Sequence, residues 1–253
     1  MLPTTLWLAA LALESVLLVR AVQGKVLKHY RFFYLYLSYV LVRDLALMPI
    51  YYLWPKIYGY AYWYSQFLSV VLGCGVVWEV YKVALTRYPG AARMARNALP
   101  FLFIFAASRI FVKAWNSPYW IPGTSTLETE RDLRFVQMVL LLGLVALFAY
   151  YAIPLRRDLK GIIYGFTVFV ATTLIHLTFG NYLGSSVRFL WPYIQPLAYI
   201  FVLLIWCRTL WSYETEPELA INPSLELDYQ LLASAARKQL RTAHSFLLRR
   251  SDD

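Results

Sequence analysis

Charged residues are scarce in this chain, and their scarcity excludes most soluble architectures. Lys, Arg, Asp and Glu make up 15% of the 253 residues, whereas a typical soluble domain contains about 25%. The long apolar runs contain few charged residues, whereas the joints between the runs and the C-terminal tail contain many. The composition therefore indicates a membrane protein with little mass outside the bilayer.

Cysteine, histidine and catalytic motifs are also scarce. Cys74 and Cys207 each lie within an apolar run, so neither indicates a disulfide framework or a zinc site. Only three histidines occur, too few within the runs to pair around a haem. The sequence has no His-Glu-x-x-His run, no Gly-x-Ser-x-Gly elbow and no phosphate-binding glycine loop. We therefore expect no metal, no cofactor and no enzymatic activity.

The chain does contain seven apolar runs separated by short polar joints. At 1.5 Å per residue, a helix of about 20 residues crosses a hydrocarbon core of about 30 Å. The predicted fold class is all-α: a polytopic integral membrane protein with a seven-transmembrane-helix bundle and a short cytoplasmic amphipathic C-terminal helix. The membrane domain is expected over residues 1–213, with spans at approximately 2–22, 31–54, 60–86, 97–116, 133–154, 161–181 and 188–212.

Lys and Arg are unevenly distributed between alternate joints. Twelve lie on one side and five on the other, and basic residues accumulate on the cytoplasmic side. We expect a multi-pass protein of the cell membrane (plasma or inner) with its N-terminus outside and its C-terminus in the cytoplasm. This distribution also accounts for the net charge of +10 without a nucleic-acid partner.

Five charged residues fall inside the predicted spans, where they face the bundle interior or mark a functional site. Neighbouring helical side chains point about 100° apart, so Arg43 and Asp44 are not expected to be main partners. We predict that Asp44 pairs with Arg109 at matching depth, and that Glu79 is the carboxylate left unpaired. Two interpretations of these five charged residues stay open: a structural ion-pair network, and a polar site that binds a ligand or relays protons. The five residues are Glu14, Arg43, Asp44, Glu79 and Arg109.

Two features predict how spans six and seven pack. Gly161 and Gly165 are four residues apart, a pattern that lets transmembrane helices approach closely. Pro192 and Pro196 are expected to kink span seven and free backbone carbonyls, which membrane proteins tolerate where the helix is packed in protein or lines a cavity.

Polar residues at related depths outline a pocket in the outer half of the bundle. Arginines there would favour an anionic group, and the surrounding Tyr and Trp side chains would favour a flat or apolar body. The ligand itself is not identified by the sequence. The candidate ligand-binding residues are Arg43, Gln66, Arg109, His176, Gln195 and Tyr199.

Two segments lie outside the spans. The outer joint 117–132 contains two prolines and a glycine and is predicted to form a bent loop at the interface. The cytoplasmic tail, residues 214–253, repeats apolar residues at helical spacing, which predicts an amphipathic helix over about 224–249. Such a helix binds the lipid bilayer, a protein partner or a second copy of itself. The tail is too short for a domain with its own core.

The leading functional prediction is a seven-transmembrane sensor or receptor-like module that binds a small ligand in the outer-half pocket and signals through a partner protein. A structural or assembly subunit of a larger membrane complex is the first alternative. A small-solute or proton transporter is the second, and it would need a cavity that opens to both faces.

Overall fold

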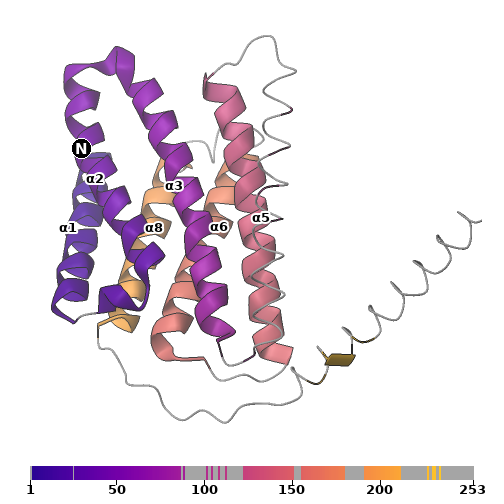
Figure 1. Ribbon diagram of the computed structural model, residues 1–253. Helices are drawn as coiled ribbons and strands as arrows, with labels where there is room; N and C mark the ends of the chain where they lie inside the picture. The colour runs from indigo at the N-terminus through magenta and orange to yellow at the C-terminus, as the bar shows by residue number, and fades with distance from the viewer. Residues whose placement is uncertain are drawn as a thin grey trace, which may run out of the picture.

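Every secondary-structure element in the described part of the chain is a helix (Figure 1). The computed structural model describes residues 2–24, 26–86, 88, 101, 104, 108, 112, 122–150, 155–179, 191–211, 227, 230, 231 and 234. Five of its helices are long and apolar enough to cross a membrane, and α8 has a shorter apolar stretch. The elements are α1 (Leu2–Gln23), the short 3-10 helix η1 (Val26–Lys28), α2 (Arg31–Leu53), α3 (Pro55–Ala84), α5 (Pro122–Tyr150), α6 (Arg157–Phe179) and α8 (Trp191–Thr209).

The helices agree with the predicted class of an all-helical, multi-pass membrane protein. The predicted span 97–116 lies outside the described residues, apart from four isolated positions. The tail is described only at residues 227, 230, 231 and 234, which are helical and exposed. The structure therefore does not test the count of seven spans.

Two helices begin earlier than the sequence predicted, and each begins at a proline. α3 starts at Pro55, and Trp54 is the single non-helical residue after α2. α5 starts at Pro122, so the prediction of a bent loop over 117–132 is wrong for residues 122–132. Proline is favoured in the first helical turn, because its fixed φ suits the helix and its missing N–H has no partner there.

Side-chain contacts fix the direction of each helix. Gln66 and Tyr81 of α3 bond residues 130 and 140 of α5 in the same order, so α3 and α5 are parallel. Glu14 and Arg20 of α1 contact Tyr199 of α8 and Trp211, two residues after the end of α8, in the same order. α1 and α8 are therefore parallel. α2 is antiparallel to α3, since residues 33 and 43 contact Glu79 and Gln66 respectively.

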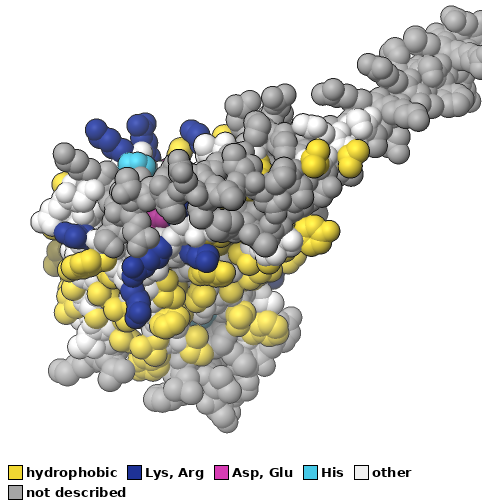
Figure 2. Space-filling view, turned by 90° about the horizontal axis from the view of Figure 1, so that it is seen from below, with side chains coloured by type: hydrophobic (Ala, Val, Ile, Leu, Met, Phe, Trp, Pro, Cys, Tyr) yellow, Lys and Arg dark blue, Asp and Glu magenta, His cyan; other side chains and the backbone are white. Residues whose placement is uncertain are grey.

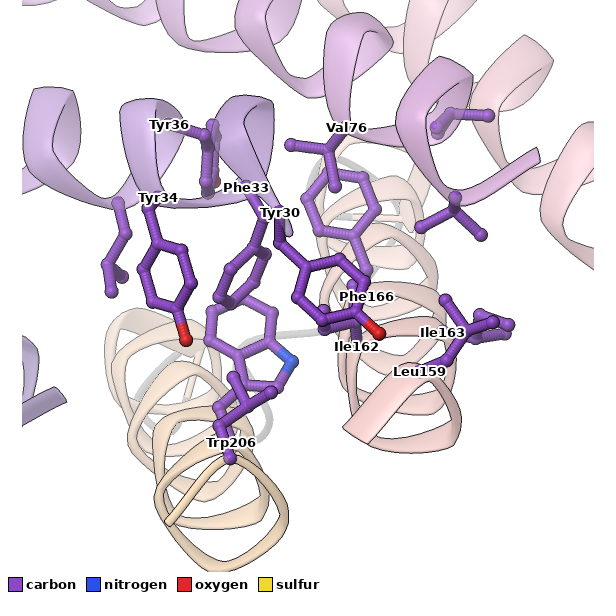
Figure 3. Packing of buried hydrophobic residues seen from close by; sticks show 14 of the residues in the cluster. Tyr30, Phe33, Tyr34, Tyr36, Val76, Leu159, Ile162, Ile163, Phe166 and Trp206 are labelled. Carbon is purple, nitrogen blue, oxygen red and sulfur yellow. The ribbon is translucent and has the colours of Figure 1, made fainter. Parts of the chain in front are cut away.

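An aromatic core lies where α2, α6 and α8 meet (Figure 3). Phe33 of α2 packs edge-on against Trp206 of α8, with ring centroids 4.9 Å apart. Tyr36 packs edge-on against Phe166 of α6 at 5.7 Å. Helices in lipid gain little from apolar burial alone, so close packing of this kind and interhelical hydrogen bonds hold them together.

The predicted close approach at Gly161 and Gly165 is present, with α8 as the neighbour. A Cβ atom at Gly161 would overlap the Thr209 side chain. A Cβ atom at Gly165 would overlap the indole of Trp206, which is fully buried. These two glycines bring α6 and α8 together below the cavity described next.

Candidate functional site

A cavity of about 350 Å³ lies between α1, α2, α3, α6 and α8. Small-molecule sites generally occupy about 300–1,000 Å³ and combine apolar walls with a few placed polar groups. The wall of this cavity has that character, since five of its residues on α1, α2 and α3 alone are aromatic or charged. The lining residues are Leu6, Trp7, Ala10, Tyr36, Val40, Arg43, Asp44, Tyr62, Gln66, Ser69, Phe169, His176, Gln195, Pro196 and Tyr199.

The structure brings five of the six predicted ligand-binding residues to this one cavity. They come from four helices: Arg43 from α2, Gln66 from α3, His176 from α6, and Gln195 and Tyr199 from α8. Arg109, the sixth, lies outside the described residues. That these residues bind a ligand stays a prediction.

Arg43 and Asp44 form an ion pair on the cavity wall. The Arg43 Nε donates to Asp44 Oδ1 at 2.8 Å, and Arg43 Nη2 lies 2.7 Å from the same oxygen. The prediction that these neighbours are not partners is therefore wrong. Although the two side chains leave the helix in different directions, the arginine side chain is long enough to turn back to the adjacent carboxylate. The predicted Asp44–Arg109 pair lies outside the described residues.

A chain of hydrogen bonds continues from this pair across α3 to α5. Arg43 Nη1 donates to Gln66 Oε1 at 2.7 Å, and Gln66 Nε2 donates to Glu130 Oε1 at 2.6 Å. Arg134 Nε lies 3.6 Å from Glu130 Oε1 as an ion pair. These contacts join three helices through charged or amide groups that are largely removed from solvent.

Sequence reasoning missed the polar face of α5. Glu130, Arg134 and Gln137 are 4%, 0% and 0% exposed, yet Glu130 was assigned to the outer joint 117–132 and the other two were not named as buried polar residues. Gln137 donates to the carbonyl of Val70 at 3.1 Å, and the Arg134 guanidinium lies 4.9 Å from the Phe169 ring centroid. Their spacing of four and three residues places them on one helical face, which would have revealed the group once the helix was extended to Pro122.

Glu79 is not the unpaired carboxylate that the sequence predicted. Its two oxygens accept the backbone N–H groups of Phe32 and Phe33 at 3.1 and 2.9 Å. The first N–H groups of a helix have no partner within the helix, and a negative charge there is favourable. Glu79 therefore holds the start of α2 against α3, and it does not reach Arg43.

Glu14 is the carboxylate with a vacant oxygen. It is fully buried, and the hydroxyl of the cavity-lining Tyr199 donates to its Oε1 at 2.6 Å. Its Oε2 has no hydrogen-bond partner within the described residues. Glu14 lies one turn after the cavity-lining Ala10 on the same face of α1, directly beneath the cavity wall.

The site thus combines an ion pair, amide and hydroxyl groups, and aromatic rings. Across the ranges that the structure describes, no three His, Cys, Asp or Glu side chains are grouped to hold a metal ion. Comparison with protein-family models, with curated proteins and with solved structures finds no match. The chemistry of the site is therefore argued from its own geometry.

Proposed function

We propose that the chain is a seven-transmembrane sensor or receptor-like module that binds a small ligand in the cavity and signals through a partner protein. The observation that carries this proposal is the cavity, which is large enough for a small molecule and is walled by five helices. A ligand that contacts several helices at once shifts the balance between their alternative packings. That is the property a sensor needs.

Two observations support the span count and orientation within this proposal. Because α3 and α5 are parallel, α3 ends at the lower end of the bundle and α5 begins at the upper end (Figure 1). A further crossing between them, the apolar run 97–116, fits this arrangement. Basic side chains are visible at the lower end of the bundle (Figure 2), where α1 ends (Figure 1) with Arg20 in its last turn and Lys28 in η1 directly after it. This favours a cytoplasmic location for that end.

The contact between α1 and the end of α8 offers a route from the cavity to the tail. Arg20 donates to the carbonyl of Trp211 at 3.1 Å, and its guanidinium lies 5.1 Å from the Trp211 ring centroid. α1 and α8 both line the cavity higher up. A shift between these two helices would therefore reach the start of the tail, where a partner protein or a second copy is expected to bind.

A structural or assembly subunit is the second candidate. The polar chain from Asp44 through Arg43 and Gln66 to Glu130 favours it. Fixing the order of the three helices is a sufficient role for such a chain, without any ligand. This candidate predicts that no small molecule stabilises the protein through the cavity.

A thermal-unfolding screen of the purified protein in lipid nanodiscs separates the two candidates. The compounds are small aromatic acids, amines and alcohols, because a ligand that binds the folded state raises its stability in proportion to ln(1 + [L]/Kd). We expect at least one class to stabilise the wild type and the Ala9→Phe control, whose side chain is exposed, but not Ala10→Phe, whose ring would fill the cavity. Equal stabilisation of both variants, or none in the wild type, would remove the proposed function.

A further inference from the structure

Three donor side chains on the cavity wall, Arg43, Gln66 and Tyr199, are already bonded to carboxylate or amide oxygens. Each guanidinium nitrogen of Arg43 contacts Asp44 or Gln66. The Gln66 amide donates to Glu130, and the Tyr199 hydroxyl donates to Glu14, both at 2.6 Å. An anionic ligand would have to compete for these donors, so the arginine on this wall is poorly suited to bind one.

Acceptors on and beneath the same wall are still available. Asp44 lines the cavity, and both of its contacts with Arg43 fall on Oδ1. Among the described residues, its Oδ2 accepts no hydrogen bond. The Oε2 of Glu14 is likewise vacant in the described part of the chain. A ligand that brings an N–H donor into the cavity would satisfy the Asp44 oxygen, whereas Glu14 is fully buried and does not line the cavity.

The buried charges around the cavity are unbalanced in the same sense. Counted over the described residues alone, two arginines, Arg43 and Arg134, accompany three carboxylates, Glu14, Asp44 and Glu130. Among the described residues Glu14 has no ion-pair partner, and its one hydrogen bond comes from the neutral Tyr199 hydroxyl. A buried carboxylate without a partner is costly, and a positive charge in the cavity would remove that cost.

Aromatic rings also line the cavity wall. Trp7, Tyr36, Tyr62, Phe169 and Tyr199 line the cavity, and the faces of such rings attract cations when water is excluded. We propose, as an extension of the ligand-binding function above, that the ligand is an organic cation. It is a protonated amine on a flat apolar body, with Asp44 as its contacting carboxylate and Glu14 as a buried counter-charge.

Three indole compounds of nearly equal shape test this assignment. Tryptamine is cationic, tryptophol is neutral and indole-3-acetate is anionic at neutral pH. Titration calorimetry on the wild-type protein in nanodiscs is expected to show tryptamine binding about tenfold or more tighter than tryptophol, the gain from a charged hydrogen bond. Indole-3-acetate is expected to bind weakest.

Variants locate the charge preference. Asp44→Asn is expected to weaken tryptamine binding about tenfold while changing tryptophol binding less than about threefold. Glu14→Gln should reduce the same tryptamine preference, and it serves if Asp44→Asn does not fold. Asp132→Asn, a partly buried carboxylate on α5 away from this cavity, is the matched control and should change neither affinity.

The amine can come from a soluble compound or from a lipid headgroup. Nanodiscs of equal phosphatidylglycerol content, completed with either phosphatidylethanolamine or a neutral galactolipid, distinguish the two. Weaker tryptamine binding only with phosphatidylethanolamine identifies a lipid amine as competitor, whereas equal binding identifies a soluble amine, and both results support a cation site.

Three results would overturn the cation assignment. Tighter binding of indole-3-acetate, equal binding of all three indoles, or no binding of any would each do so. The wider screen with Ala10→Phe and Ala9→Phe judges the proposed function separately, because it includes acids and alcohols. A cavity that binds only those would keep the sensor proposal and remove the amine.

Discussion

Glu79 and Glu14 show how much a single buried carboxylate depends on its neighbours. Both lie in apolar helices and are 8% and 0% exposed. Glu79 accepts two backbone N–H groups from α2, whereas Glu14 accepts one hydroxyl and keeps a vacant oxygen. Glu79 thus has a structural role, and Glu14 is the carboxylate that we propose as a counter-charge to a cationic ligand. The sequence could not separate them, since it does not show which backbone groups lie opposite a side chain.

Replacing Glu79 by Gln should destabilise the protein without affecting the cavity. The amide has one acceptor oxygen in place of two and no charge, so one N–H of Phe32 or Phe33 loses its partner. We expect a loss of about 1–3 kcal/mol, measured by denaturant unfolding of the protein in detergent micelles. Lys82→Gln, an exposed change one turn away, should stay within about 0.5 kcal/mol. Equal stability of Glu79→Gln and the wild type would refute the capping role.

At the scale of the helices, the sequence predicted which helices exist better than where each helix begins. The runs at 2–22, 31–54 and 161–181 correspond to α1, α2 and α6, because predominantly apolar stretches of that length mark spans directly. α5 was started too late, since its polar first turns were interpreted as a loop. That error hid Glu130, and with it the hydrogen-bond chain from α2 to α5.

The contact between α6 and α8 should be sensitive to a single methyl group. Gly165→Ala would place its Cβ against the buried indole of Trp206, and overpacking of a dense core costs about 1–3 kcal/mol. Gly59→Ala is the matched control, because a Cβ at that helical position meets nothing within 4 Å. It should be neutral or stabilising, by up to about 1 kcal/mol.

Thermal unfolding of both glycine variants measures this difference. A lower Tm for Gly165→Ala together with an unchanged or higher Tm for Gly59→Ala is the expected result. If the two variants had the same Tm, α6 and α8 would not pack as closely as described.

For the molecule as a whole, orientation is the property most readily tested. Replacing Cys74 and Cys207 by Ala provides a background without thiols. Cysteine placed at Lys56, at the α2–α3 end, should react with a membrane-impermeant maleimide in intact cells. Cysteine placed at Lys28, at the opposite end, should react only after permeabilisation. The reverse labelling pattern would place the N-terminus in the cytoplasm.

The candidate site was partly predictable at this scale. Arg43, Gln66, His176, Gln195 and Tyr199 could be grouped because the rise per residue gives an approximate depth in the bilayer, which put the group in the outer half, and the structure has them lining one cavity. Depth does not say which side chains bond each other. The Arg43–Asp44 pair and the Glu14–Tyr199 contact depend on the rotation of each helix, which the tertiary packing sets.

The most direct test of the central claim, that the cavity is a ligand site, is an experimental map of the protein with tryptamine. Cryo-electron microscopy in nanodiscs, with an antibody fragment bound to increase particle mass, provides it. The account predicts density between Trp7, Asp44 and Tyr199, with the amine directed at Asp44. A cavity filled by the protein's own side chains, or tryptamine seen only on the lipid-facing surface, would contradict it.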